Sequence, residues 1–413
     1  IETLQTVYAK SKNANLILSN IATYASCVLS VNSSDSDAKI LSSKVTNIWT
    51  NLSKATNAQR LIVSKMPEPV KNLYLKSPET KPSAYALERT REVAKYNLSL
   101  REEDLISSLK QNGITAWGKL YSNLSSSIQV TTKGKTIGLA AASSNLRSPD
   151  EETRKNAYQA ISKGWKEHRE TCAAILNAQI GWRLDMDRKR GEKESKNFLT
   201  DALQANRITQ KTLDAMMNAV KMKRDTGVRA LKLQANLLQK KKLEPWDLLA
   251  DCPTVSGESK RFSYEEGLKL IASAYGAINP EMDEFVKKMD QNQWIEGSVG
   301  DFKRTGAYCT GFKKSRNPRV YMTYQGSAGD VSTLAHELGH AFHNWKMRDL
   351  PIELASYPMT LAETASIFGE TVVGNYLIKE AKTLQDKMSV AWGNAGSAAA
   401  FLINIPAIST TVF

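Results

Sequence analysis

Two histidines and a glutamate, His336, Glu337 and His340, follow one another with the spacing H-E-x-x-H. On a helix, residues four apart lie about 5 to 6 Å from each other on one face, so both imidazoles can bind one ion. Glu337 would then lie beside the ion without being a ligand, where it can take a proton from zinc-bound water. The pattern predicts a catalytic zinc centre with one zinc ion per chain.

The alternative is that these are ordinary helix residues. The chain has 4 histidines, and His336, His340 and His343 fall within one short stretch, which favours the metal interpretation. His343 lies seven residues after His336 and could face the same side. We expect it to support the ligands rather than bind the ion, because so short a span of one straight helix rarely wraps a metal.

A catalytic zinc normally has three protein ligands, so a third must come from elsewhere in the chain. Residues 357–370 predict a further helix, because Pro358 and Thr360 mark its start and apolar residues recur at helical spacing. Glu363 lies one turn inside this helix, and Glu370, seven residues later, shares its face, where we expect it to support the ligands as His343 does. By spacing alone, Glu363 could equally be a ligand or a solvated carboxylate.

Several segments around these residues resemble the thimet oligopeptidase and oligoendopeptidase F family of zinc metallopeptidases. The segments are GAYCTGF at 306–312, RVYMTYQG at 319–326, DVSTLAHELGH at 330–340, PMTLAETAS at 358–366 and, further upstream, ILNAQIGWRL at 175–184. The resemblance implies that His336, His340 and Glu363 bind zinc and that Glu337 is the general base. It also implies a zinc-dependent endopeptidase, which hydrolyses short peptides by Glu-assisted attack of zinc-bound water.

In the resembled family, the catalytic domain continues into a segment whose tyrosine and histidine side chains bind substrate and stabilise the oxyanion. This chain ends at Phe413, so we expect the carboxy-terminal part of the catalytic domain to be incomplete and peptide cleavage to be slow. Four tyrosines near the motif could substitute as donors, namely Tyr308, Tyr321, Tyr324 and Tyr357. No substrate-binding residue is assigned.

The expected partners are short peptides and, in addition, a second polypeptide that supplies the missing carboxy-terminal segment. An alternative from another class is a non-catalytic subunit derived from a peptidase, or a peptide-binding module of a larger assembly. The net charge of +14, from 56 Lys and Arg against 42 Asp and Glu, is one reason to keep it. The basic clusters lack interleaved aromatic residues, so we predict solvated faces and no nucleic-acid partner.

The composition, 41% hydrophobic and 24% charged, is ordinary for a globular protein. No run approaches the roughly 18 apolar residues of a membrane-spanning helix, and the first residues lack a secretory signal. The 4 cysteines include no C-x-x-C pair, which favours a reducing compartment. We therefore expect an intracellular protein, in the cytoplasm or an organelle matrix, that is not secreted.

The periodicity of apolar residues predicts a mostly α fold with a few short strands. We expect two lobes: a helical amino-terminal lobe, residues 1–139, that ends in a hairpin at 127–139, and a zinc-binding catalytic lobe, residues 140–413. A small β-sheet should lie next to the zinc-binding helix, and a substrate cleft should separate the lobes. Other predicted elements include helices at 83–96, 209–243, 263–275 and 280–289, and strands at 308–312 and 319–324.

Overall fold

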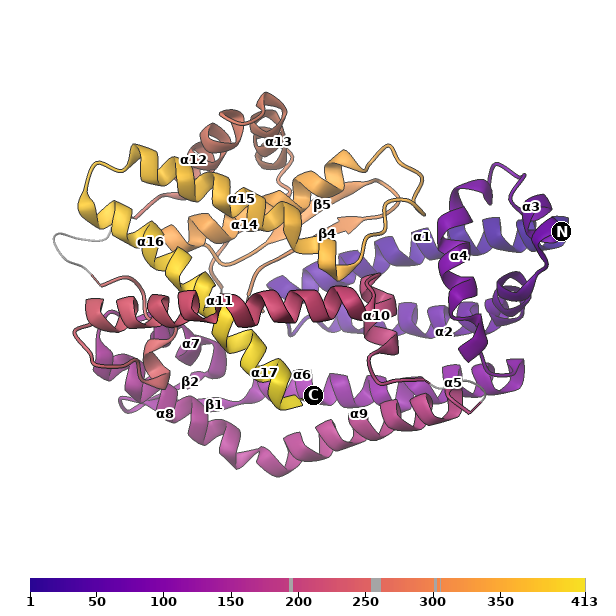
Figure 1. Ribbon diagram of the computed structural model, residues 1–413, viewed down its shortest axis with the longest axis horizontal. Helices are drawn as coiled ribbons and strands as arrows, with labels where there is room; N and C mark the ends of the chain where they lie inside the picture. The colour runs from indigo at the N-terminus through magenta and orange to yellow at the C-terminus, as the bar shows by residue number, and fades with distance from the viewer. Residues whose placement is uncertain (193–195, 254–260, 301–302, 305, 413) are drawn as a thin grey trace.

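The computed structural model describes residues 1–413 except 193–195, 254–260, 301–302, 305 and 413. The chain is mostly helical, as predicted, and its first part contains six helices and a hairpin (Figure 1). These elements are α1 (Glu2–Val31), α2 (Ser36–Lys65), α3 (Glu68–Tyr74), α4 (Ala84–Glu92), α5 (Leu100–Asn112), α6 (Ile114–Ser127), β1 (Gln129–Thr132) and β2 (Lys135–Gly138).

A second group of helices crosses the lower and middle parts of the molecule in Figure 1. They are α7 (Leu139–Ser144), α8 (Glu151–Glu167), α9 (Arg169–Arg190), α10 (Thr200–Asn206) and α11 (Gln210–Leu237). The predicted hairpin is confirmed, with Lys133 and Gly134 at positive φ in its turn. Its residues Ile128 and Val130 pack with Ala142 and with α8, so the hairpin shares a small core with the helices that follow it.

The last part of the chain contains the larger sheet and the helices that surround it. These elements are α12 (Tyr264–Gly276), α13 (Pro280–Gln291), β3 (Ile295–Glu296), β4 (Tyr308–Phe312), β5 (Asn317–Tyr321), α14 (Ala328–Lys346), α15 (Met359–Glu380), α16 (Leu384–Ala399), a π-helical segment (Ala400–Asn404) and α17 (Ile405–Val412). The strand order is β3-β5-β4, in which β5 pairs parallel with β3 and antiparallel with β4.

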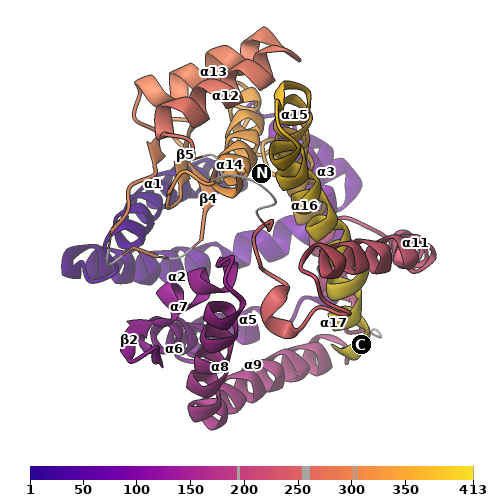
Figure 2. The same ribbon diagram turned by 90° about the vertical axis from the view of Figure 1, so that its left-hand side faces the viewer.

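The largest core lies between α12, α13, α14 and the sheet. Fully buried side chains such as Ile271, Phe285, Val320 and Leu334 fill it. In the turned view, α12 to α15 lie together in the upper half, whereas α8 and α9 form the lower end of the molecule (Figure 2). The division into lobes at residue 139 and the substrate cleft between them stay predictions.

Several element boundaries differ from the sequence prediction, and the helix predicted at 357–370 extends to Glu380. The helix predicted at 83–96 ends at Glu92 and continues as a 3-10 turn, a common tightening at helix ends. The helix predicted at 209–243 stops at Leu237, because the chain turns through Gln239 at φ 58°. Strand β5 spans Asn317–Tyr321 rather than 319–324 and therefore includes Pro318. At Pro318, β5 pairs with β4 but not with β3, so the position that lacks an N–H can face the side without a strand.

Among the described residues, helix α1 is long and apolar enough to cross a membrane, with a mean hydropathy of 1.4 over 18 residues. The sequence analysis expected no such segment. This property follows from the length and the composition of the helix alone, and a helix packed inside a folded protein can share it. Here α1 packs along α2, where Trp49 donates to Asn15, and contacts β4 through Thr23 and Gly311. The intracellular location stays a prediction.

Candidate metal centre

Helix α14 carries both motif histidines, and its start is fixed by local hydrogen bonds. Ser327 and Asp330 form a capping box, in which the Ser327 hydroxyl accepts from the Asp330 N–H and the Asp330 carboxylate accepts from the Ser327 N–H. Four residues apart on this helix, the rings of His336 and His340 lie with centroids 4.8 Å from each other, nearly perpendicular. The spacing therefore places both imidazoles on one face, as the motif predicted.

Helix α15 packs against α14 and brings Glu363 to the two histidines. The Glu363 Oε2 lies 3.2 Å from His336 Nε2 and 3.4 Å from His340 Nε2. The ligand atoms of these three residues all lie within 4.8 Å of one another. The structure thus brings together the three residues that the sequence proposed as ligands, whereas their role as zinc ligands stays a prediction.

A hydrogen bond to each of these three side chains orients the group. The Nδ1 of His336 contacts the Glu370 carboxylate, and Ser366 donates to Glu363 Oε2 at 2.7 Å. His340 has a hydrogen bond with the Ala362 backbone. When Nδ1–H donates to a carboxylate or carbonyl, the neutral imidazole keeps a lone pair on Nε2, which is the tautomer that a metal needs. Glu370 lies on the face predicted from the sequence, whereas the role of Ser366, one helical turn after Glu363, was not predicted.

The protonation of the two histidines follows from these contacts. The Glu370 carboxylate raises the pKa of His336, although burial acts in the opposite direction. Burial lowers the pKa of His340, and the Glu363 carboxylate opposes that shift. A neutral His340 is therefore favoured near pH 7, which leaves its Nε2 available as a ligand atom.

Glu337 lies inside α14, with 5% of its surface exposed. Its Oε2 is buried and has no hydrogen-bond partner among the described residues. Burial raises the pKa of Glu337 to about 7, and Glu363 and Glu370 act in the same direction against His336. A buried carboxylate without a partner is costly unless a cation lies beside it. Together with two imidazoles and a carboxylate as donors, this arrangement fits a zinc ion.

His343 lies outside the group of ligand atoms. Its ring stacks on that of Tyr357, with centroids 4.5 Å apart, and its buried Nδ1 has no partner among the described residues. Burial lowers its pKa. That His343 does not bind the ion directly stays a prediction.

Three of the four tyrosines considered as oxyanion donors are engaged elsewhere. The hydroxyls of Tyr308 and Tyr321 both donate to Ser30 on α1, at 2.8 Å, and that of Tyr324 contacts backbone carbonyls at the start of α12. Tyr357 donates to a side-chain amide on α14 over 3.4 Å, a long bond. Of the four, Tyr357 is therefore the hydroxyl that could most readily turn to a substrate.

Strand β4 forms the sheet edge next to the metal centre. It carries Cys309, whose pKa is raised to about 12 by burial and by the charge of Glu337. A strand edge at this place can pair with an extended peptide or be merely structural. At the far end of β4, Thr23 donates to the Gly311 carbonyl at 3.4 Å, so α1 already covers that end. Pairing of a peptide with the remaining part of β4 stays a prediction.

The chain matches the family model described as Peptidase family M3 over residues 144–394 and that described as Oligopeptidase F over residues 64–129. It is 24% identical to Oligopeptidase PepF of Bacillus subtilis, over 90% of this chain and 56% of that protein. It is 25% identical to Group B oligopeptidase PepB of Streptococcus agalactiae, over 71% of this chain and 49% of the relative. The chain spans about half the length of these curated relatives.

Solved structures agree in fold. Oligoendopeptidase-F from Enterococcus faecium superposes with a TM-score of 0.63 at 18% identity, covering 97% of this chain and 65% of that one. PZ peptidase A, solved with an inhibitor, superposes with a TM-score of 0.71 at 17% identity. The superposition covers 97% of this chain and 72% of that one. These matches to peptidases do not support a second polypeptide that supplies a missing carboxy-terminal segment. They also do not favour a non-catalytic module.

Proposed function

Because the chain belongs to peptidase family M3, we propose that it is a zinc-dependent endopeptidase that hydrolyses short peptides. In this proposal His336, His340 and Glu363 hold the zinc ion, and Glu337 is the general base. The observation that carries it is the convergence of two imidazole Nε2 atoms and one carboxylate oxygen beside Glu337, whose buried Oε2 has no hydrogen-bond partner among the described residues. No observation favours the non-catalytic alternative over it.

Each of these side chains has a separate task. A bound zinc ion would polarise the scissile carbonyl and make water more acidic. Glu337 accepts the proton of the attacking water at its carboxylate and then passes it to the leaving amine. Its raised pKa, about 7, suits a group that must take up and release a proton near neutral pH. Glu370 and Ser366 hold His336 and Glu363 in place.

The test of this role is the substitution Glu337→Gln, which keeps the size of the side chain but removes the base. We expect peptide hydrolysis to fall by about 100-fold to 10,000-fold, the usual contribution of general acid–base catalysis. The zinc content, measured by mass spectrometry of the metal, should stay at one per chain because Glu337 is not a ligand.

Chelation of the parent chain is the matched control. Removal of zinc should abolish hydrolysis of a quenched fluorescent peptide, and added zinc should restore it. If Glu337→Gln cleaves that peptide as fast as the parent chain, the role proposed for Glu337 is wrong.

A further inference from the structure

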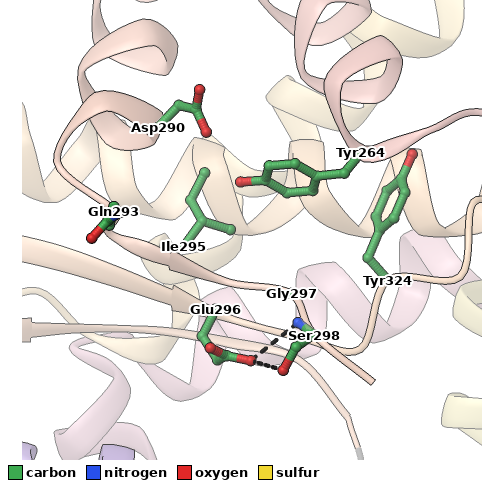
Figure 3. A pocket seen from close by; sticks show the side chains of 8 residues that line it. All are labelled: Tyr264, Asp290, Gln293, Ile295, Glu296, Gly297, Ser298 and Tyr324. Carbon is green, nitrogen blue, oxygen red and sulfur yellow. Dashed lines mark hydrogen bonds between the residues drawn. The ribbon is translucent and has the colours of Figure 1, made fainter. Parts of the chain in front are cut away.

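A cavity of about 420 Å³ opens at the sheet edge formed by β3, opposite the edge formed by β4. Its walls come from the start of α12, the end of α13, β3 and the segment after β5 (Figure 3). This volume is within the range of small-ligand sites. The proposed metal centre lies beside β4, so this cavity is a separate feature of the molecule.

Two tyrosines form a rigid aromatic wall in the cavity. The rings of Tyr264 and Tyr324 meet edge to face, with centroids 5.8 Å apart. Tyr324 is held at its hydroxyl by two carbonyls of the α12 start, and it fits there because a Cβ at Gly267 would lie 2.4 Å from that hydroxyl. The hydroxyl of Tyr264 points toward the side of the cavity where Asp290 lies (Figure 3). A face of this kind can pack against the stem of a long side chain.

The lining is acidic although the chain as a whole is basic. The cavity residues include the carboxylates Asp290 and Glu296 and contain no lysine or arginine. Glu296 is already bonded to Lys303, at 2.8 Å, and to Ser298. Asp290 is exposed, forms a side-chain hydrogen bond with Tyr264, and has no ion-pair partner among the described residues. Among the described residues, no cation therefore pairs with the negative charge of Asp290 beside the aromatic wall, in a chain whose net charge is +14.

The floor of the cavity offers backbone groups as well. The carbonyls of Trp294 and Glu296 accept from the N–H groups of Val320 and Met322, both at 2.9 Å, on the β5 side. Alternate residues of a parallel strand bond to the same neighbour, so the N–H and C=O of Ile295 point to the other side. Because β3 is an edge strand, that side has no strand partner among the described residues. An extended peptide can pair with such an edge.

We propose that this cavity binds a short extended peptide segment through a basic residue, whose cationic head pairs with Asp290 and whose stem lies on Tyr264. The peptide backbone pairs with Ile295. The occupant is basic because the unpaired charge at the rim is negative, and it is short because β3 has only two residues. The site would hold basic peptides away from the metal centre. Its role in the protein rests on the proposed peptidase function.

Binding is measured without turnover, on the full chain carrying Glu337→Gln and stripped of zinc. The probes are acetyl-Ala-Arg-Ala-amide, its counterpart with glutamate in the centre, and an arginine peptide with one backbone nitrogen methylated, all titrated by calorimetry. We expect the arginine peptide to bind at least tenfold more tightly than the glutamate peptide. Added Asp290→Asn should weaken arginine-peptide binding by about two- to fivefold, the contribution of an exposed ion pair.

The matched control is Glu284→Gln, which removes an exposed acidic residue of the same helix that does not line the cavity. It should leave the affinity unchanged, whereas methylation of the peptide nitrogen should lower it. The proposal is overturned if the arginine peptide does not bind, if both peptides bind equally, or if Asp290→Asn has no effect. Hydrolysis by the parent chain is assayed separately, so failure of the peptidase proposal would leave this binding result intact.

Discussion

Glu363 differs from the two histidines in charge as well as in origin. It is the only one of the three proposed ligands that brings a negative charge, and it comes from α15 rather than from α14. Ser366 donates to the same oxygen that faces both imidazoles, so the carboxylate is held in the group by a residue of its own helix. Binding of the zinc ion should therefore depend more on Glu363 than on any residue other than His336 and His340.

The substitutions Glu363→Ala and His343→Ala separate a ligand from a neighbour. We expect Glu363→Ala to lose most of its zinc, because the site keeps only two neutral donors. His343→Ala should retain the ion with an affinity lower by about 10-fold to 100-fold, as residues that orient ligands typically do. Competition with a chromogenic chelator measures both affinities. An empty site in His343→Ala together with a full site in Glu363→Ala would reverse the ligand assignment.

The contact between α14 and α15 decides whether the residues of the two helices meet. A Cβ at Gly339 would lie 2.5 Å from the Ala365 carbonyl oxygen, and a Cβ at Gly369 would lie 2.9 Å from the Ala335 carbonyl oxygen. The two backbones therefore approach each other closely at two points on either side of the metal centre. Any larger side chain at these positions pushes the helix that carries Glu363 away from the histidines.

Gly339→Ala tests this close approach. We expect it to lower the free energy of unfolding by about 1 to 3 kcal/mol, as overpacked cores usually do, and to weaken zinc binding. The control is Gly181→Ala in α9, where an added Cβ meets no atom within 4 Å. That change should be neutral or stabilising by up to about 1 kcal/mol, because alanine favours a helix. Urea unfolding and chelator competition on both variants measure the effects, and unchanged zinc affinity in Gly339→Ala would contradict the argument.

The helices and the placement of the two motif histidines on one face could be predicted because their signals are local, whereas Glu363 was proposed as a ligand from the family resemblance. Helical periodicity and the spacing of His336 and His340 both lie within short stretches of sequence. The partners that only the folded chain brings together could not be predicted. Strand β3 has two residues and no alternating pattern, and the free side of Ile295 follows from its pairing with β5. The acidic cavity combines segments that are distant in sequence, so its lining carries no motif.

At the scale of the whole molecule, helix α1 joins the first part of the chain to the metal-binding part. Tyr8 donates to Glu353 at 2.8 Å, and Lys12 contacts the same carboxylate at 2.7 Å. Glu353 lies in the loop between α14 and α15, and its side chain is 8% exposed. Further along α1, Ser30 accepts hydrogen bonds from the sheet. The position of the loop that leads into α15 thus depends on the Glu353 carboxylate, which residues near the start of α1 hold.

Burial opposes ionisation of Glu353, but Lys12 and Tyr8 outweigh it and hold the pKa below its ordinary value. A lowered pKa in the folded state means that the stabilisation is fully present above the pKa of the unfolded chain, about 4.3, and is lost as the pH falls through the folded value. We expect Glu353→Gln to lower the free energy of unfolding at pH 7 by about 1.5 to 3 kcal/mol, the value of hydrogen bonds to a charged group. Urea unfolding from pH 7 to pH 3 should show the difference between parent and variant shrinking below about pH 4. The control is the exposed Glu170, whose change to Gln should give no such difference at any pH. If the difference in the free energy of unfolding between the parent chain and Glu353→Gln stays constant down to pH 3, the Glu353 carboxylate does not hold α1 through its charge.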